Sequence, residues 1–84
     1  MIKVTVITTK GCSHCENAKQ ILNKLKAKYD LKIEEVDVES NHGQKLAQEY
    51  RIMSSPGILI NDKFFSMGGV TEEQLRTKFN EFKK

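Results

Sequence analysis

The chain has 84 residues and a formal net charge of +3, with 14 basic and 11 acidic side chains. This length suits one small domain, which we expect to span residues 1–84. No run of about 18 apolar residues is present, so the sequence predicts no membrane span. The basic residues are mostly lysines scattered along expected helix faces without interleaved aromatic residues, which argues against nucleic-acid binding.

The first segment, residues 2–7, is rich in β-branched side chains and is typical of a buried strand. Residues 8–11 break this run, and Gly11 permits a tight turn there. The next segment predicts an amphipathic helix over residues 17–29, with an apolar face made by Ala18, Ile21, Leu22, Leu25 and Tyr29. We expect this helix to begin near Cys12 or Ser13, with Ser13 as N-cap and Glu16 completing a capping box.

A second strand is expected over residues 31–38, where the apolar pattern changes phase at Glu34-Glu35. That change predicts a bulge or an edge position in the sheet. Two strands joined by a helical segment favour a right-handed, parallel βαβ unit. Residues 40–43 then form a turn with capping residues, and residues 44–51 predict a short helix with Leu46, Ala47 and Tyr50 facing inward.

The only proline, Pro56, precedes a third predicted strand over residues 57–60. Asn61-Asp62 suits a two-residue type I′ hairpin turn into a return strand over residues 63–67. Residues 71–74 form a second predicted capping box, and the last helix places Leu75, Phe79 and Phe82 on one face. The expected order is β-α-β-α-β-β-α, which predicts an α/β fold with a mixed four-stranded sheet flanked by helices.

The two cysteines, Cys12 and Cys15, lie at the expected start of the first helix. A disulfide between them closes a very short loop and adds little stability, so the pair favours thiol chemistry or soft-metal binding. A helix N-terminus stabilises an anion, which predicts Cys12 as the nucleophile. Cys15 leans toward the buried helix face and is predicted to resolve the mixed disulfide that Cys12 forms.

This arrangement resembles the thioredoxin fold over essentially the whole chain: a strand, a CxxC at a helix start, a second βα pair, and a Ser-Pro before a β-hairpin and closing helix. Among its members the chain is similar to small glutaredoxin-like and redox-active disulfide proteins. The resemblance implies a thiol–disulfide oxidoreductase without a bound cofactor. Two positions depart from thioredoxins, because Gly11 and Val6 replace a tryptophan and a buried aspartate; Ser13-His14 replaces the Pro-Tyr of glutaredoxins.

The resemblance also implies roles for single residues. The bond before Pro56 is expected to be cis and to lie against the cysteines, which leaves the Ser55 backbone to pair with a substrate strand. The alternative is a trans proline opening an edge strand. Cys-x-His-Cys resembles the motif of disulfide isomerases and periplasmic oxidants, so His14 is expected to favour the thiolate and raise the reduction potential. The alternative is a solvent-facing histidine.

Glutathione is a candidate co-substrate. Lys10 is expected to attract a glutathione carboxylate or to lower the Cys12 pKa. Further substrate contacts are expected from Ser13, Gly68, Gly69 and Thr71. The alternative for these positions is structural, as a strand end and helix caps. The expected partners are protein disulfides together with an upstream reductase or glutathione.

A soft-metal carrier that binds through Cys12 and Cys15 is the alternative function. Copper and mercury carriers, however, have the order β-α-β-β-α-β and end in a strand, and no further metal site is expected in this chain. We expect a monomer in the cytoplasm, because the first residues show no leader and a CxxC disulfide there is more often catalytic than structural.

Overall fold

The computed structural model describes residues 2–53 and 55–82. Its elements follow the predicted order and confirm the α/β class; they are β1 (Ile2–Thr8), α1 (Ser13–Lys26), β2 (Leu31–Asp37), α2 (Asn41–Glu49), β3 (Gly57–Ile60), β4 (Lys63–Met67) and α3 (Glu72–Phe82). Among the helices described, none is long and apolar enough to cross a membrane.

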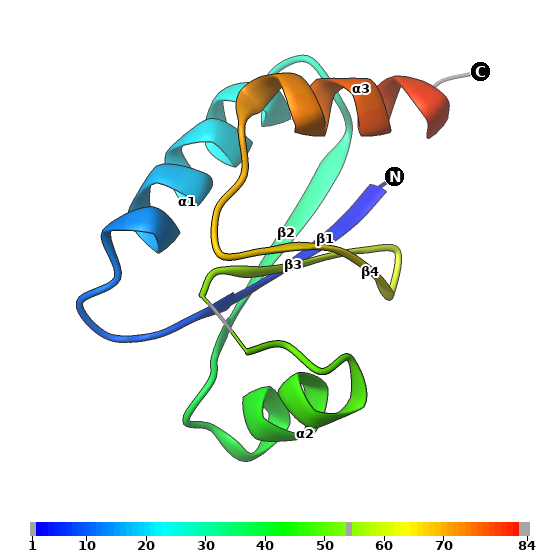
Figure 1. The fold of residues 1–84 in the computed structure, drawn as a ribbon. Coiled ribbons are helices and arrows are strands. Elements are labelled where there is room, and N and C mark those ends of the chain that lie inside the picture. The colour runs from blue at the N-terminus through cyan, green and yellow to red at the C-terminus, as the bar shows by residue number, and fades with distance from the viewer. Residues whose placement is uncertain (1, 54, 83–84) are drawn as a thin grey trace.

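The four strands form one mixed sheet in the order β2-β1-β3-β4. β1 pairs in parallel with β2 and antiparallel with β3, and β4 pairs antiparallel with β3. Helices α1 and α3 cover one face of the sheet and α2 covers the other (Figure 1). The mixed four-stranded sheet and the parallel pairing of its first two strands are therefore confirmed.

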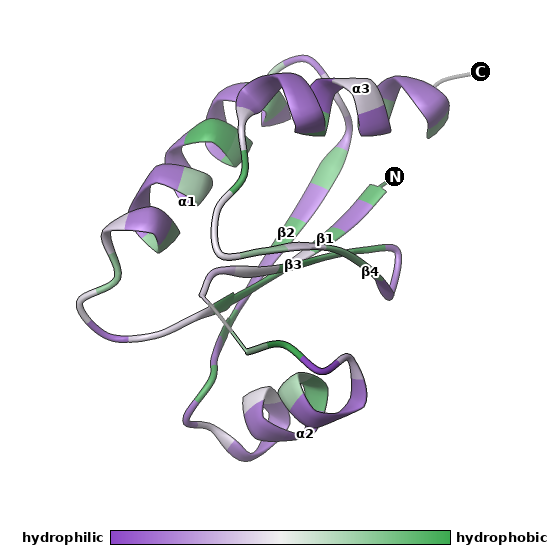
Figure 2. Ribbon diagram, viewed as in Figure 1, coloured by the Kyte–Doolittle hydropathy of each residue, from purple (hydrophilic) through white to green (hydrophobic). Residues whose placement is uncertain are grey.

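Two apolar clusters hold the layers together. Because side chains alternate across a strand, β1 sends Val4 and Val6 under α1 and α3, and Ile7 under α2. β3 is hydrophobic along its length, whereas the outer surfaces of the helices are mostly hydrophilic (Figure 2). The central pair β1 and β3 is thus buried on both faces, which fixes the backbone from which the site is built.

The second strand is an edge strand, as its apolar pattern predicts, but the predicted bulge at Glu34-Glu35 is wrong. The β1–β2 register runs without a shift from Ile2↔Leu31 to Thr8↔Asp37. The phase of the pattern changes because different helices cover different parts of the strand: Ile33 packs with the cluster under α1, and Val36 with the cluster under α2. The irregularity in this sheet lies instead between β3 and β4.

Two helices, α1 and α2, have bounds that differ from the prediction. α1 ends at Lys26 rather than running to Tyr29, although the amides of Lys28 and Tyr29 still bond to the Leu25 carbonyl at 2.9 Å. Tyr29 follows the helical spacing because its ring packs on Phe79, 5.5 Å away between centroids. α2 begins at Asn41, three residues before the predicted start, because the Ser40 hydroxyl caps it by accepting the Gly43 amide at 3.0 Å.

The hairpin and the last helix largely follow the prediction. Asn61 and Asp62 both have positive φ, as a type I′ turn requires. Thr71 and Gln74 form the predicted capping box, because each side chain accepts the other residue's backbone amide. Phe82 is less buried than Leu75 and Phe79: its side chain is 43% exposed, and the Lys78 ammonium lies 5.4 Å from the centre of its ring.

Gly43 lies in α2, where it allows the helix to pack closely against the end of β2. A Cβ at this residue would collide with the backbone carbonyl of Asp37 at the end of β2. Alanine is normally the better helix former by about 1 kcal/mol. We nevertheless expect Gly43→Ala to lower the free energy of unfolding by about 2 kcal/mol, because backbone atoms must move to admit the methyl group.

Urea unfolding followed by circular dichroism measures this change. Gln48→Ala, at an exposed position of the same helix, is the matched control and should leave the midpoint nearly unchanged. A stability gain for Gly43→Ala would show that α2 does not pack this closely against the end of β2.

Candidate active site

The two cysteines lie where the chain leaves the central strand. β1 ends at Thr8, Gly11 turns the backbone with a φ of +70°, and α1 begins directly after Cys12. Cys12 is half-buried, whereas Cys15 is 2% exposed and packs beneath the first turn of the helix. Both residues are free thiols.

Cys12 itself is the N-cap of α1, so the predicted N-cap role of Ser13 is wrong. Its backbone is extended, with φ −89° and ψ 108°, and its Sγ accepts the backbone amide of Cys15 at 3.1 Å. The CxxC spacing equals the spacing between an N-cap and the third helical residue, which is why the sulfur reaches that amide. Ser13 is the first helical residue and is exposed, and Glu16 pairs with Lys19 instead of completing a capping box.

The surroundings of Cys12 lower the pKa of its thiol. The largest cause is a hydrogen bond with the Cys15 side chain, which outweighs the opposing effect of desolvation. The backbone amide of Cys15, the Thr9 hydroxyl and the backbone amide of His14 lower the pKa further. Each of these groups favours the thiolate because it donates a hydrogen bond to the charged sulfur.

The Cys15 thiol is perturbed in the opposite direction. Burial raises its pKa most, and the hydrogen bond with Cys12 and the charge of the Cys12 thiolate raise it further. The Thr9 backbone and the charge of Lys19 act against this rise. The two opposite shifts favour Cys12 as the thiol of the pair that ionises first.

Pro56 lies beside the cysteine loop because β3 pairs with the end of β1. The register aligns Gly57 with Ile7, so Pro56 comes next to the point where β1 ends. The Ser55–Pro56 peptide bond is cis, the isomer that the resemblance implies, and Pro56 is buried. The Thr9 and Ser55 hydroxyls are hydrogen-bonded at 3.2 Å, which joins the cysteine loop to the residue before the proline.

The two glycines after β4 are tied to the same region. The Gly68 amide donates to the Pro56 carbonyl at 3.1 Å, and the Gly69 carbonyl accepts the Ser66 hydroxyl at 3.0 Å. Thr71 directly precedes α3, and its hydroxyl caps that helix by accepting the Gln74 amide. Gly68 therefore belongs to the surroundings of Pro56, while Gly69 and Thr71 form the connection to α3.

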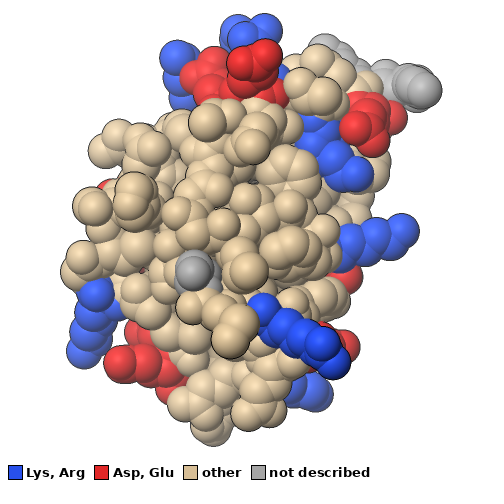
Figure 3. All heavy atoms as spheres, viewed as in Figure 1, with Lys and Arg blue, Asp and Glu red and all other residues tan. Residues whose placement is uncertain are grey.

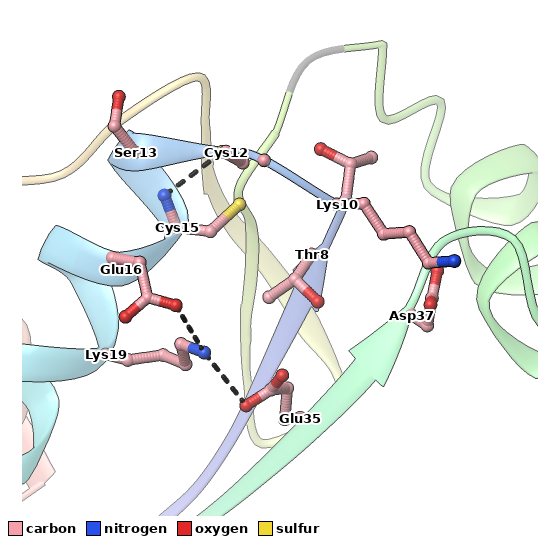
Figure 4. A pocket seen from close by; sticks show the side chains of 11 residues that line it. Thr8, Lys10, Cys12, Ser13, Cys15, Glu16, Lys19, Glu35 and Asp37 are labelled. Carbon is pink, nitrogen blue, oxygen red and sulfur yellow. Dashed lines mark hydrogen bonds and ion pairs between the residues drawn. The ribbon is translucent and has the colours of Figure 1, made fainter.

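The charged and polar residues predicted for the site lie at different positions relative to the cysteines. Lys10 and Ser13 line the same pocket as the cysteines, but the Lys10 side chain extends away from Cys12, on the side of Asp37 (Figure 4). The His14 side chain is exposed and makes no hydrogen bond or ion pair within residues 2–53 and 55–82. Its backbone amide, rather than its imidazole, is what reaches the Cys12 thiol. His42 is exposed in the first turn of α2.

A pocket of about 420 Å³ opens beside the cysteines, between α1 and β2. Its lining includes Thr9, Lys19 and Glu35, which the sequence analysis did not assign to the site. The Lys19 ammonium lies 3.1 Å from Glu16 Oε1 and 3.4 Å from Glu35 Oε2, directly below Cys15 in the view of Figure 4. Lys19 was accessible to sequence reasoning because it follows Cys15 by one helical turn, whereas Glu35 required the strand register.

Metal ligands do not gather around the thiols. Across the part of the chain that the structure describes, no group of three or more His, Cys, Asp and Glu side chains could hold a metal ion. The element order ends in a helix, which differs from the order expected for a copper or mercury carrier.

Comparison with known proteins decides the family. The sequence matches the family described as Glutaredoxin-like domain (DUF836) over residues 3–80. The chain belongs to this family. It is 25% identical to a probable thioredoxin of Archaeoglobus fulgidus over 83 residues, covering 99% of this chain and 91% of that one. It is 28% identical to a thioredoxin of Methanocaldococcus jannaschii over 74 residues, covering 88% and 87% of the two chains.

The fold of this glutaredoxin-like chain is shared with solved structures. An uncharacterized thioredoxin-like protein from Clostridium perfringens superposes with a TM-score of 0.81 at 17% identity, over 96% of this chain and 70% of that one. Together with the family match and the thioredoxin relatives, this shows that the chain is a member of the thioredoxin-fold superfamily. Its family and its pair of cysteines together support a thiol-redox function.

The Thr9 hydroxyl provides a test of the electrostatics around Cys12. Thr9→Val keeps the side-chain shape but removes the hydroxyl that favours the thiolate. We expect the pH midpoint of Cys12 alkylation by iodoacetamide to move upward, because the thiolate is the reacting species. Mass spectrometry of the reduced protein at a series of pH values gives this midpoint for Cys12 separately from Cys15.

Ser13→Ala is the control for that measurement. Ser13 is adjacent to Cys12 and also carries a hydroxyl, yet it makes no hydrogen bond within the described residues. Its removal should leave the midpoint in place. If the pH midpoint of Cys12 alkylation moves equally in Thr9→Val and Ser13→Ala, the shift is not specific to the Thr9 hydroxyl, and the prediction is wrong.

Proposed function

We propose that this protein is a thiol–disulfide oxidoreductase in which Cys12 is the nucleophile and Cys15 the resolving thiol. The single observation that carries this proposal is the division between the two sulfurs. Cys12 caps the helix with a lowered pKa and remains accessible, whereas Cys15 is buried with a raised pKa. The first is suited to attack an incoming disulfide, and the second to react only within the protein.

The reaction proceeds in two exchanges. The Cys12 thiolate attacks one sulfur of a substrate disulfide, forms a mixed disulfide and releases the other substrate sulfur as a thiolate. Cys15 then loses its proton to solvent and attacks the Cys12 sulfur. The Cys12–Cys15 disulfide forms, and the second substrate sulfur leaves and is protonated. The substrate gains two electrons and the protein loses two.

Protein disulfides are the substrates that the surroundings of Pro56 favour. Within the described residues the Ser55 backbone makes no hydrogen bond, so it is available to an extended substrate segment. Met67 pairs with Gly57 beside Pro56 and is 42% exposed, and Met53 is 88% exposed. The face between α1 and α2 carries few charged side chains (Figure 3), which suits contact with a polypeptide surface.

Electrons reach the Cys12–Cys15 disulfide from an upstream reductase or from glutathione, and this proposal needs no bound cofactor. The support for glutathione is the resemblance, together with the place of Lys10 and Ser13 at the rim of the pocket that contains both thiols. We further propose that the protein works as a monomer in the cytoplasm. Within that proposal the disulfide is a transient catalytic state.

The resolving role of Cys15 has a direct test. Cys15→Ser leaves the first attack intact and removes the second, so a mixed disulfide at Cys12 should accumulate with a protein disulfide or with glutathione disulfide. Intact-protein mass measures the adduct. Cys12→Ser is the matched control, because it retains one thiol but should form little adduct and lose turnover. Adduct formation at Cys15 instead would contradict the assignment of the two roles.

The reduction potential tests the part that His14 plays. A protonated imidazole near Cys12 would stabilise the thiolate, so His14→Ala is expected to lower the potential of the Cys12–Cys15 pair. The side chain is exposed, so screening should keep the decrease below about 30 mV. Equilibration in glutathione redox buffers, followed by thiol-specific mass shifts, measures both potentials. An unchanged potential would leave His14 as a surface residue.

A further inference from the structure

The pocket beside the cysteines contains one cation that the proposed reaction does not yet use. Lys19 follows Cys15 by four residues, so both side chains lie on the same face of α1. Glu16 and Glu35 hold its ammonium at 3.1 and 3.4 Å, and all four residues line the pocket. The Lys19 side chain is 28% exposed, less than the side chain of either Glu16 or Glu35.

The strand register explains why this cation is held below Cys15. Glu35 pairs with Val6 across the parallel β1–β2 ladder, and neighbouring residues in register project to the same face of a sheet. Val6 belongs to the cluster under α1, so Glu35 also projects toward α1. A carboxylate from β2 and one from the first turn of α1 therefore fix a lysine from that helix from two directions (Figure 4).

We propose that the Lys19 ammonium, held by Glu16 and Glu35 in the pocket, stabilises the Cys15 thiolate in the step that resolves the mixed disulfide. This inference rests on the proposed function and concerns only its second exchange. In that step Cys15 gives its proton to solvent, its sulfur bonds to Cys12, and the substrate sulfur leaves Cys12 with the electron pair. Lys19 acts electrostatically and exchanges no proton or bond.

The charge of Lys19 acts on Cys15 in the direction that this role requires. The Cys15 pKa is raised chiefly by burial, and the charge of Lys19 acts in the opposite direction. Hydrogen bonds to Glu16 and Glu35 raise the pKa of Lys19, which keeps its ammonium charged over the working pH range. Once Cys12 is in a mixed disulfide its own negative charge is gone, so the remaining field at Cys15 comes from the fixed charges.

Those charges come from three segments packed around the pocket. They are Glu16 and Lys19 of α1, Glu35 and Asp37 of β2, and Lys10 with the Cys12 thiol from the loop after β1. His14 is not among the pocket residues. Lys10 extends away from the sulfurs, so Lys19 is the cation placed to act on Cys15 (Figure 4).

A chromogenic aromatic disulfide, dithiobis-nitrobenzoate, separates the two exchanges in the full chain. Its first nitrothiobenzoate is released when Cys12 attacks, and its second when Cys15 resolves the adduct. Stopped-flow absorbance across a pH series gives a rate for each phase. The variants are Lys19→Met, which removes the charge, and Lys19→Arg, which keeps it. The matched control is Lys24→Met, which removes a cation of the same helix that pairs with Glu72 at 3.2 Å.

The proposal predicts that the pH profile of the second-phase rate in Lys19→Met crosses that of the unmodified chain. Below the midpoint of the second phase, Lys19→Met should resolve about two- to fivefold more slowly than the unmodified chain, because less Cys15 is ionised. Above the midpoint it should match or exceed the unmodified chain, because a more basic thiolate is a better nucleophile. Lys19→Arg and Lys24→Met should follow the unmodified profile, and the first phase should be the same in all four proteins.

Each other outcome has a definite meaning. If Lys19→Met slows the second phase equally at every pH, the residue is structural and the proposal is wrong. An unchanged profile, or an equal shift in Lys24→Met, also overturns it. If no first phase occurs in the unmodified chain, the proposed function itself fails, which is a separate result. Should Lys19→Met not fold, Lys19→Gln is measured against the same profile.

Discussion

The pairing of β1 on both of its edges is the constraint on which the rest of the structure depends. Its parallel partner β2 brings Glu35 and Asp37 to one side of the cysteine loop, and its antiparallel partner β3 brings Gly57, and with it Pro56, to the other. Both faces of β1 are buried, so the end of the strand at Thr8 has little freedom. Every part of the candidate site is positioned relative to that one point.

The site gives the two chemically identical thiols, Cys12 and Cys15, different surroundings. The two thiols are three residues apart, yet a helix terminus and hydrogen-bond donors surround one of them, whereas the other is buried. Thr9 adds a link to Ser55, so the nucleophile and the segment before the cis proline are held by a shared side chain. The opposite shifts of their pKa values follow from position, because the two groups are chemically identical.

The sequence was sufficient wherever structure follows from local chemistry. The type I′ turn at Asn61-Asp62, the Thr71–Gln74 capping box and the burial of Cys15 each depend on residues close together in the chain. The bulge expected at Glu34 and the Tyr29 end of α1 were wrong, because helices distant in sequence shaped those patterns. Glu35 could not be assigned to the site, since only the register with Val6 places it there.

Because Cys12 is the N-cap of α1, the strength of the helix start would change during the reaction that we propose. A thiolate is a strong acceptor for the Cys15 amide, whereas a disulfide sulfur is a weak one, so the cap loosens once Cys12 becomes covalently bound to substrate. The first turn of α1 is then least restrained when Cys15 must approach Cys12. In this way the same sulfur that begins the exchange also releases the segment that completes it.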